Sequence, residues 1–534
     1  MSQELTSDYV VVGAGSAGAV LAARLSEDPG VQVTLLEAGQ RDKGMNIHIP
    51  AAFSKLFQTE HDWDYSTEPQ PELGGRRIYW PRGRMLGGCS SMNAMMWVKG
   101  FQADYEEWGA AAGPEWGWDA VKKTYARLED VEDATALDGI GGPVRVERQR
   151  SPRACTESFL QAAEQAGYPR GRANGPNPEA FVETMVTQRR GARWSTAAAY
   201  LKPAAKRANL RVVTGAQVSR VTFDGSRATG VEAVVDGQRT TITARREVIL
   251  SGGAINTPQL LMLSGIGPAA QLKGFGIDVV HDAKEVGENL ADHLVAGIGW
   301  EVETGSLATA ESLRQLADYL LRRRGMLTSN VGEAYGFLRS RPDLDAPDIE
   351  MIFAPAGFFD EGLIAFQGEG VVAGPILVDP ASRGRITLAS TDPSAKAVID
   401  PRYLSDPEGR DRAAMVEGVR VALEIASQPS LKPILGRFLR PDVPTDSTAE
   451  EVADAILERH AHTLYHPTGT CRMGTDEASV VDPRLRVRGV EGLRVADASI
   501  MPRIVRGHTN APSILIGERA AELIATDRAP QRTL

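Results

Sequence analysis

The sequence predicts an α/β protein (α+β overall) in which a Rossmann-type nucleotide-binding domain carries an inserted second domain. Three observations predict this fold. The first 40 residues follow the order strand, glycine-rich turn, helix, strand, which opens a dinucleotide-binding βαβ unit. Residues 300–460 mix amphipathic helical windows with strand-like stretches, as a separate domain would. The length of 534 residues also exceeds one ordinary domain.

The elements of the first domain are predicted from local composition. Residues 9–12 are a β-branched run that suits a buried parallel strand, residues 19–25 are helix-forming, and residues 31–36 form a strand that ends at Glu37. Short strands separated by Gly or Asp predict a small β-meander, followed by a strand at 247–250. The meander strands are expected at residues 210–213, 218–223, 230–235 and 240–244.

The second domain is less regular in sequence. Residues 310–324 and 410–426 have the periodicity of amphipathic helices, whereas residues 348–354 and 384–388 have the composition of strands. An antiparallel sheet with helices is the expected result.

The glycine-rich turn is Gly13-Ala14-Gly15-Ser16-Ala17-Gly18. Gly13 permits the tight turn, Gly15 lets the backbone approach a pyrophosphate at the helix N-terminus, and Gly18 lets helix and strand pack closely. Glu37, at the end of the second strand, is placed to accept hydrogen bonds from a ribose hydroxyl and to repel a 2′-phosphate. The pattern predicts a dinucleotide other than NADP, and leaves NAD and FAD open.

Two further glycine-rich stretches have the small residues that allow a backbone to approach a ligand closely. They occupy residues 83–93 and residues 253–267. In the second stretch, Thr257 is expected to cap a helix with Pro258 at its first position, and Gly265 or Gly267 is expected to end that helix.

These two stretches resemble the two sequence signatures of the glucose-methanol-choline (GMC) oxidoreductase family. The first departs from the family only at Cys89, where Gly, Ser or Thr is usual, and a small Cys should be tolerated there. The resemblance extends along the whole chain and includes residues 62–65, 287–293, 465–474 and 494–499.

The resemblance implies a GMC oxidoreductase fold with FAD as the cofactor. It places the FAD-binding domain at residues 1–150, 188–300 and 463–534, and the substrate-binding domain at residues 151–187 and 301–462. The residues expected to bind FAD are Gly13, Gly15, Ser16, Ala17, Gly18, Glu37, Ala38, Trp63, Met85, Gly87, Ser90, Asn93, Ala94, Met95, Val218, Tyr465, Asp497, Ala498, His508, Asn510 and Ala511.

Two of the eight histidines match the catalytic positions of the family. His466 follows Tyr465 and resembles the catalytic histidine, and His508 stands where members carry His or Asn. Alcohol oxidation removes a proton from the hydroxyl group and a hydride from the α-carbon; flavin N5 accepts the hydride. An imidazole is suited to accept the proton at neutral pH. The resemblance therefore implies oxidation of a primary alcohol to the aldehyde.

The substrate pocket is predicted from family position alone. Trp97, Phe353, Phe358 and Phe359 are expected to line it. Choline oxidases of the family carry a glutamate just after the Asp-His of residues 292–293, where this chain has Leu294 and Val295, so choline is disfavoured. Their covalently flavinylated histidine corresponds to Met92, and the FAD is therefore expected to be non-covalent.

Composition excludes several classes of partner. The net charge of −10 disfavours non-specific binding to nucleic acid or to an anionic membrane, and the basic run Arg322-Arg323-Arg324 is interpreted as a solvated helix face. The three cysteines, including Cys155 and Cys471, have no metal-ligand spacing, so no metal site is expected. No apolar run is long enough for a membrane span, and the polar N-terminus does not resemble a signal peptide. A cytoplasmic monomer or homodimer is expected.

Alternatives remain at the level of the reaction. Hydroxynitrile lyases and a flavin photoenzyme share this fold, and a non-enzymatic FAD-binding protein is a third possibility; the pair His466 and His508 favours alcohol oxidation. The electron acceptor is either O₂ or a quinone-like compound. Residues 325–334 resemble the bacterial alcohol and choline dehydrogenases of the family and weakly favour the second.

Overall fold

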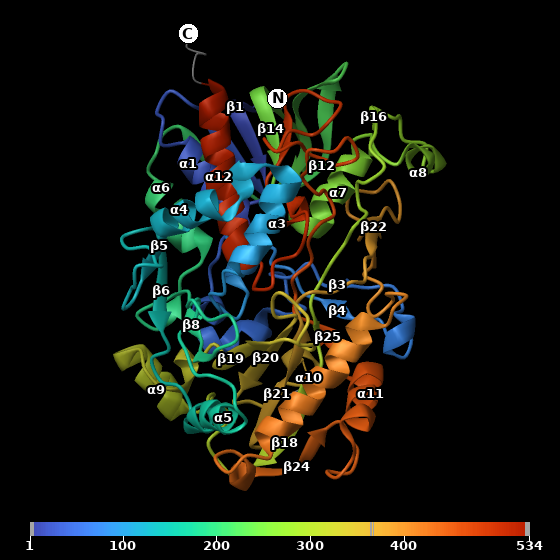
Figure 1. Ribbon diagram of the computed structural model, residues 1–534. Coiled ribbons are helices and arrows are strands. Elements are labelled where there is room, and N and C mark those ends of the chain that lie inside the picture. Colours follow the sequence, from blue (N-terminus) through green and yellow to red (C-terminus); the bar gives the residue numbers. More distant parts are fainter. Residues whose placement is uncertain (1–4, 364–365, 367, 529–534) are drawn as a thin grey trace.

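The computed structural model describes residues 5–363, 366 and 368–528, which form two layered regions stacked end to end (Figure 1). The upper region in Figure 1 holds both described chain ends and a largely parallel sheet. The lower region holds an antiparallel sheet covered by helices.

The first sheet has a parallel core in the order β11-β2-β1-β14, with β26 also parallel to β14 and with β13 and β12 attached antiparallel. The β-branched run of β1 is buried on both faces, as a central parallel strand requires. The strands are β1 (Leu5–Val12), β2 (Val33–Glu37), β11 (Leu210–Thr214), β12 (Ala216–Asp224), β13 (Arg227–Val235), β14 (Gln238–Leu250) and β26 (Leu493–Val495).

The meander prediction was only partly right. Residues 210–213 belong to β11, which pairs parallel to β2, and the strands expected at 240–244 and 247–250 are one continuous strand, β14. The first half of β14 pairs with β13 and its last residues pair with β26. One long strand thus supports both a hairpin and the parallel core.

Helices cover this sheet and the loops beside it. α12 packs along α1, where a Cβ on Gly517 would lie only 2.6 Å from the carbonyl oxygen of Ala17, so glycine allows the close approach. The helices are α1 (Ser16–Leu25), α3 (Gln102–Ala112), α4 (Trp118–Leu128), α6 (Lys202–Ala204), α7 (Gly253–Leu263), α8 (Ala269–Gly274) and α12 (Asn510–Arg528).

The expected start of α7 was wrong. The helix begins at Gly253, so Pro258 lies inside it, and the hydroxyl of Thr470 donates to the carbonyl of Ala254 (2.7 Å), the group that a residue-258 N–H would otherwise bond. Thr257 does not cap the helix; its hydroxyl accepts the N–H of Gly252 and donates to Asp497 (2.6 Å). The hydrogen bonds to Thr470 and Asp497 therefore tie α7 to the C-terminal part of the chain.

The second sheet is antiparallel, in the order β24-β18-β21-β20-β19-β7, and β17 links β21 to β25. Its strands are β7 (Phe181–Glu183), β17 (Leu294–Val295), β18 (Ile298–Val302), β19 (Ala334–Leu338), β20 (Ile349–Ala354), β21 (Gly370–Leu377), β24 (Leu435–Arg440) and β25 (His462–Thr463). The sheet already includes β17 and β18, so it begins before residue 301, where the second domain was expected to resume.

Two helices, α5 (Ala154–Gln165) and α10 (Arg410–Ala426), pack on the outside of this sheet, α11 (Ala449–Arg459) packs on α10, and a fourth helix, α9 (Leu313–Arg322), lies at the edge (Figure 1). The remaining short α-helix and strands are α2 (Met45–His48), β3 (Tyr65–Ser66), β4 (Tyr79–Trp80), β5 (Glu129–Val131), β6 (Val144–Arg148), β8 (Met185–Val186), β9 (Gln188–Arg189), β10 (Ala192–Arg193), β15 (Ile266–Gly267), β16 (His281–Asp282), β22 (Arg385–Thr387) and β23 (Val398–Asp400).

Candidate active site

Four parallel strands of the first sheet end at one edge. The register pairs Val12 with Leu36 and with Leu250, and pairs Leu250 with Val495. The loops that follow these residues therefore meet beyond the carboxyl ends of the strands, which is where open α/β sheets bind nucleotides.

The glycine-rich turn after β1 has the shape of a phosphate cradle. A Cβ on Gly13 would lie 2.4 Å from the carbonyl oxygen of Ser251, and a Cβ on Gly18 would lie 1.9 Å from that of Gly13. At Gly15 a Cβ would meet no described atom within 4 Å, so nothing in the protein explains the missing side chain there. Gly15 faces the cavity and opens α1, which fits a pyrophosphate against the helix N-terminus.

Glu37 ends β2 beside this turn. Its two carboxylate oxygens accept the N–H groups of Ala14 and Gly39, each at 2.9 Å. Burial raises the pKa of Glu37 to about 7, against the lowering effect of these two hydrogen bonds. A carboxylate oxygen has a second lone pair, and Glu37 lines the cavity, so it remains able to accept a ribose hydroxyl.

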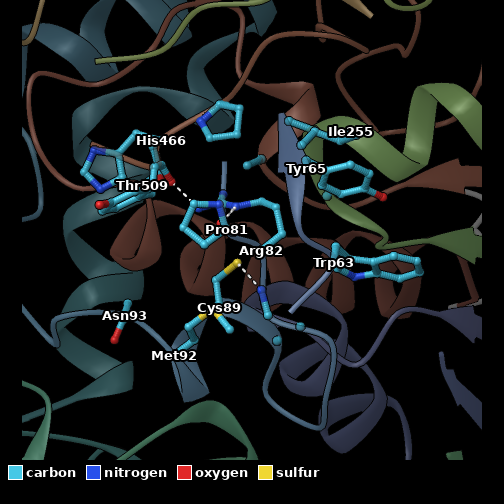
Figure 2. Close-up of a pocket in the computed structure, with 18 of the residues that line it drawn as sticks. Trp63, Tyr65, Pro81, Arg82, Cys89, Met92, Asn93, Ile255, His466 and Thr509 are labelled. Carbon is cyan, nitrogen blue, oxygen red and sulfur yellow. Dashed lines mark hydrogen bonds between the residues drawn. The ribbon is translucent and has the colours of Figure 1, made fainter. Parts of the chain in front are cut away.

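A single cavity of about 370 Å³ runs from this turn toward the second sheet. Figure 2 shows His466 and Thr509 on one side of it, Trp63, Tyr65 and Ile255 on another, and Met92 and Asn93 on a third. The expected FAD-binding residues that line it are Gly13, Gly15, Ser16, Ala17, Glu37, Ala38, Trp63, Asn93, Ala94, Met95, Val218, Tyr465, Asp497, Ala498, His508 and Asn510. The combination of phosphate cradle, acid and elongated cavity fits FAD.

The other expected FAD-binding residues lie behind the wall of this cavity. Gly18 packs against Gly13, and Ser90 donates its hydroxyl hydrogen bond to the carbonyl of Gly87 (2.7 Å). Met85 is fully buried in an apolar cluster and Ala511 lies within the buried start of α12. Their contribution is to hold the shape of the loops that line the cavity.

Two of the four expected pocket residues do not line the cavity. Trp97 donates its indole N–H to Glu129 (2.7 Å) in the core. Phe353 stacks on Phe159 with ring centroids 4.7 Å apart. Phe358 and Phe359 do line the cavity, as expected, and Phe53 and Phe57, which were not anticipated, line it with them.

The two predicted catalytic histidines lie together on the cavity wall. The ring centroids of His466 and His508 are 4.8 Å apart, and both side chains are almost buried. Burial, and then the neighbouring His508 and His293, lower the pKa of His466 well below its ordinary value of 6.5. His466 is therefore a neutral imidazole at pH 7.

A third histidine, His293, also contacts His466. The two Nδ1 atoms are 3.0 Å apart, so one ring donates and the other accepts. Burial, followed by His508, lowers the pKa of His293 to about 3, and this ring is neutral as well. The sequence marked His293 only as part of a family stretch; no local signal connected it with His466.

Asp292 holds the backbone on which His466 sits. One carboxylate oxygen accepts the N–H of His466 (2.7 Å), and the other accepts the hydroxyl groups of Thr463 (2.6 Å) and Tyr403. Tyr465, just before His466, has a left-handed φ of 69°, and Arg82 donates to its carbonyl at 2.5 Å. These contacts fix the direction in which His466 leaves the chain.

His508 is fixed by a buried acid. Its Nε2 lies 3.1 Å from both carboxylate oxygens of Glu350, a fully buried residue of β20. The backbone N–H of His508 donates to the carbonyl of Val98 (3.1 Å). An acid within a buried apolar strand was the one signal in the sequence that could have singled out Glu350.

Within the described residues, no cluster of His, Cys, Asp or Glu could hold a metal ion, and no helix is long and apolar enough to cross a membrane.

Comparison with known proteins agrees with this geometry. Models of the GMC oxidoreductase family match residues 7–295 and 380–517. The chain is 61% identical to a GMC-type oxidoreductase of Mycobacterium tuberculosis over 523 residues, covering 97% of this chain and 99% of the relative. It is 43% identical to an alcohol dehydrogenase [acceptor] of Pseudomonas putida, covering 97% and 95%. It is also 43% identical to mitochondrial choline dehydrogenase of Homo sapiens, covering 97% and 89%.

Solved structures give the same result. The chain is similar to pyridoxine 4-oxidase from Mesorbium loti, with a TM-score of 0.88 and 31% identity over 97% of this chain and 99% of that chain. It is similar to formate oxidase of Aspergillus oryzae, with a TM-score of 0.91 and 28% identity over 99% of each chain. The chain belongs to the GMC oxidoreductase family and is an FAD-dependent oxidoreductase that acts on CH–OH donors.

Proposed function

We propose that this enzyme oxidises primary alcohols to aldehydes, with His466 as the proton acceptor and His508 as the group that positions the alcohol oxygen. The observation that carries the proposal is the placement of the two imidazoles, 4.8 Å apart, in the cavity that also reaches the phosphate cradle. When bound, FAD supplies the hydride acceptor, N5 of the flavin.

His466 is suited to take the hydroxyl proton because it is neutral at pH 7. Its Nδ1 is occupied by His293, which leaves Nε2 for the substrate. To act as a base, His466 must carry its ring proton on Nδ1 and donate it to Nδ1 of His293. His293 Nδ1 then accepts from His466, and His466 Nε2 carries the free lone pair of a base.

His508 is suited to hold the alcohol oxygen. With Nε2 bound to Glu350, only Nδ1 can serve the substrate, and the ring is unable to turn without breaking both contacts. An oxygen that bridges the two rings would give its proton to Nε2 of His466 and accept the hydrogen that Nδ1 of His508 must then carry, which holds the alcohol in a reactive geometry.

The cavity wall beside the histidines supports an uncharged, apolar substrate. Phe53 and Phe358 lie 5.7 Å apart, and Phe57 lies 6.0 Å from Tyr465. Asp360 also lines the cavity, but it forms a bidentate ion pair with Arg440. Its charge is therefore compensated, and an ammonium group would gain little from it.

The FAD is proposed to be non-covalent. Met92 lines the cavity at the position where the family's linking histidine is expected, and a thioether cannot form that bond.

We further propose a quinone-like electron acceptor rather than O₂. The support is the 43% identity to an alcohol dehydrogenase [acceptor], compared with 39% to an oxygen-dependent choline dehydrogenase and 31% to an oxidase. Air-saturated buffer added to the reduced enzyme tests this: reoxidation at or above the turnover rate with stoichiometric H₂O₂ would contradict it.

The reaction itself is tested without oxygen. Purified enzyme is mixed with a panel of primary alcohols, and the flavin absorbance and the aldehyde are measured together. The proposal expects bleaching with one aldehyde formed per flavin. A holoenzyme that is bleached by none of the alcohols, yet cleaves a cyanohydrin or acts on a fatty acid under light, would instead be a lyase or a photoenzyme.

A further inference from the structure

α9 exposes apolar side chains on its outward face. Leu313 and Leu321 are each 84% exposed, and Leu320 is 54% exposed. With the exposed Ala317 they follow the spacing i, i+4, i+7, i+8, which places them on one side of the helix. A helix at the edge of a globular domain normally turns such a stripe toward the core.

The inward face of α9 is apolar too. Tyr319 is buried and Leu316 half-buried against a cluster that includes Ile47, Phe53 and Phe57, and Tyr319 donates to the carbonyl of His48 (3.2 Å). Phe53 and Phe57 also line the cavity. The helix is therefore anchored on the protein through one face, beside the apolar end of the cavity, and its leucine stripe is a second, separate surface.

Basic side chains border the leucine stripe. Arg314 is exposed near the start of α9, and Arg322, Arg323 and Arg324 are exposed at its end. Against these four cations, residues 313–324 contain one acid, Asp318, which lies 3.5 Å from Arg322. A local excess of positive charge stands out on a chain whose net charge is −10.

We propose that α9 docks the enzyme on the surface of an anionic lipid bilayer. Exposed leucines inserted at the headgroup boundary, with arginines facing anionic lipid, are the arrangement of an interfacial helix. A second copy of this chain fits the surface less well, because a symmetric contact would bring each leucine stripe and its arginines against the same arginines of the partner. The sequence alone suggested only a solvated face for Arg322–Arg324, because exposure of the leucines depends on how the helix packs.

The proposal is tested by co-sedimentation of the FAD-loaded enzyme with vesicles. Phosphatidylcholine vesicles containing phosphatidylglycerol should carry the enzyme down at low salt, whereas pure phosphatidylcholine vesicles or high salt should retain little. Replacing Arg314, Arg322 and Arg324 by Gln should lower the partition coefficient on the order of 100-fold, at about fivefold per arginine. The double variant Leu313→Ser/Leu321→Ser should also lose binding.

The matched control is Leu137→Ser/Ile140→Ser, which removes two other exposed apolar side chains (56% and 76%) that lie in the loop between β5 and β6. This variant should bind as the wild type does. Every variant is first checked for its FAD content and for its rate of anaerobic flavin reduction by alcohol, which the α9 changes should leave unaltered.

Three results would overturn the proposal. The first is a wild-type holoenzyme that stays in the supernatant with anionic vesicles. The second is an equal loss of binding in the control variant. The third is a wild-type dimer that Leu313→Ser/Leu321→Ser converts to a monomer while neither binds vesicles, since the stripe would then be an interface between copies. None of these depends on which alcohol the enzyme oxidises.

Discussion

Nδ1 of His466 lies 3.0 Å from Nδ1 of His293, and the two imidazole planes are nearly perpendicular, at 81°. This contact commits one nitrogen of His466 to the protein and leaves the other for the substrate. His293 therefore determines which nitrogen of His466 is free. In the same way, the residue that hydrogen-bonds one nitrogen of a metal-bound histidine determines which nitrogen binds the metal.

The pH dependence follows from the lowered pKa of His466. The base form is lost as the pH falls through that pKa, so kcat/KM for the alcohol should stay level from pH 8 to about 6.5 and fall only below it.

His293→Ala should lower the rate of flavin reduction on the order of 10-fold. It should also move the acid limb to higher pH, because it removes a neighbouring imidazole and admits water. His293→Gln should be milder. An unchanged pH profile in His293→Ala would show that the residue only fills space.

Glu350 is expected to act through His508. Glu350→Gln keeps the shape of the side chain but replaces the carboxyl group by an amide, and should lower kcat/KM on the order of 10-fold without loss of FAD. His508→Asn should be milder than His508→Ala, because an amide can still hydrogen-bond the alcohol. The control is Glu333→Gln, another fully buried acid, which contacts Thr156 and Ser329 instead. If both variants lose the same activity, the effect of Glu350 is general destabilisation.

The purified protein should be yellow and should release intact FAD on acid or heat precipitation. Met92 is the residue at the expected linkage position, and the cavity geometry around Gly15 and Glu37 provides non-covalent contacts. Flavin that stays with the precipitate would contradict this. In that case Cys89, which also lines the cavity, is the residue to replace by Ser.

Choline should be a poorer substrate than benzyl alcohol or a medium-chain primary alcohol, as judged by kcat/KM. Val295 lines the cavity where a choline-type site would carry a carboxylate, and the aromatic wall of Phe53 and Phe358 offers only apolar surface. Val295→Glu should shift the ratio toward choline, provided that the variant retains FAD. A wild-type preference for choline would contradict the proposed substrate class.

The sequence predicted the parts of the site that depend on local chain geometry. Gly13 and Gly15 follow the first strand and Glu37 ends the second, and two neighbouring parallel strands bring these residues to the same edge of the sheet. By contrast, the partners of the two histidines come from other elements: Glu350 from β20, and His293 from the residue before β17. Long-range packing decides which strands lie beside His466 and His508. No short segment of the sequence contains that information.

The predicted pocket residues show, within a single strand, the same limit on what the sequence alone can predict. Side chains of β20 alternate between the faces of the sheet, so Ile352 and Ala354 line the cavity while Phe353, between them, packs on Phe159. Glu350 lies two residues before Ile352 and so on the same face of the strand, where it contacts His508. The sequence indicated the strand but not which of its side chains face the cavity, and Phe353 was assigned to the wrong face of the sheet.

The most direct test of the central claim is the rate of anaerobic flavin reduction in His466→Ala, measured by stopped flow with the preferred alcohol. FAD content is determined first, because the substitution lies beside the cofactor cavity but leaves the phosphate cradle intact. If His466 accepts the hydroxyl proton, the variant should keep its FAD and reduce it slower by on the order of 10²-fold or more. An FAD-loaded variant reduced as fast as the wild type would contradict the account.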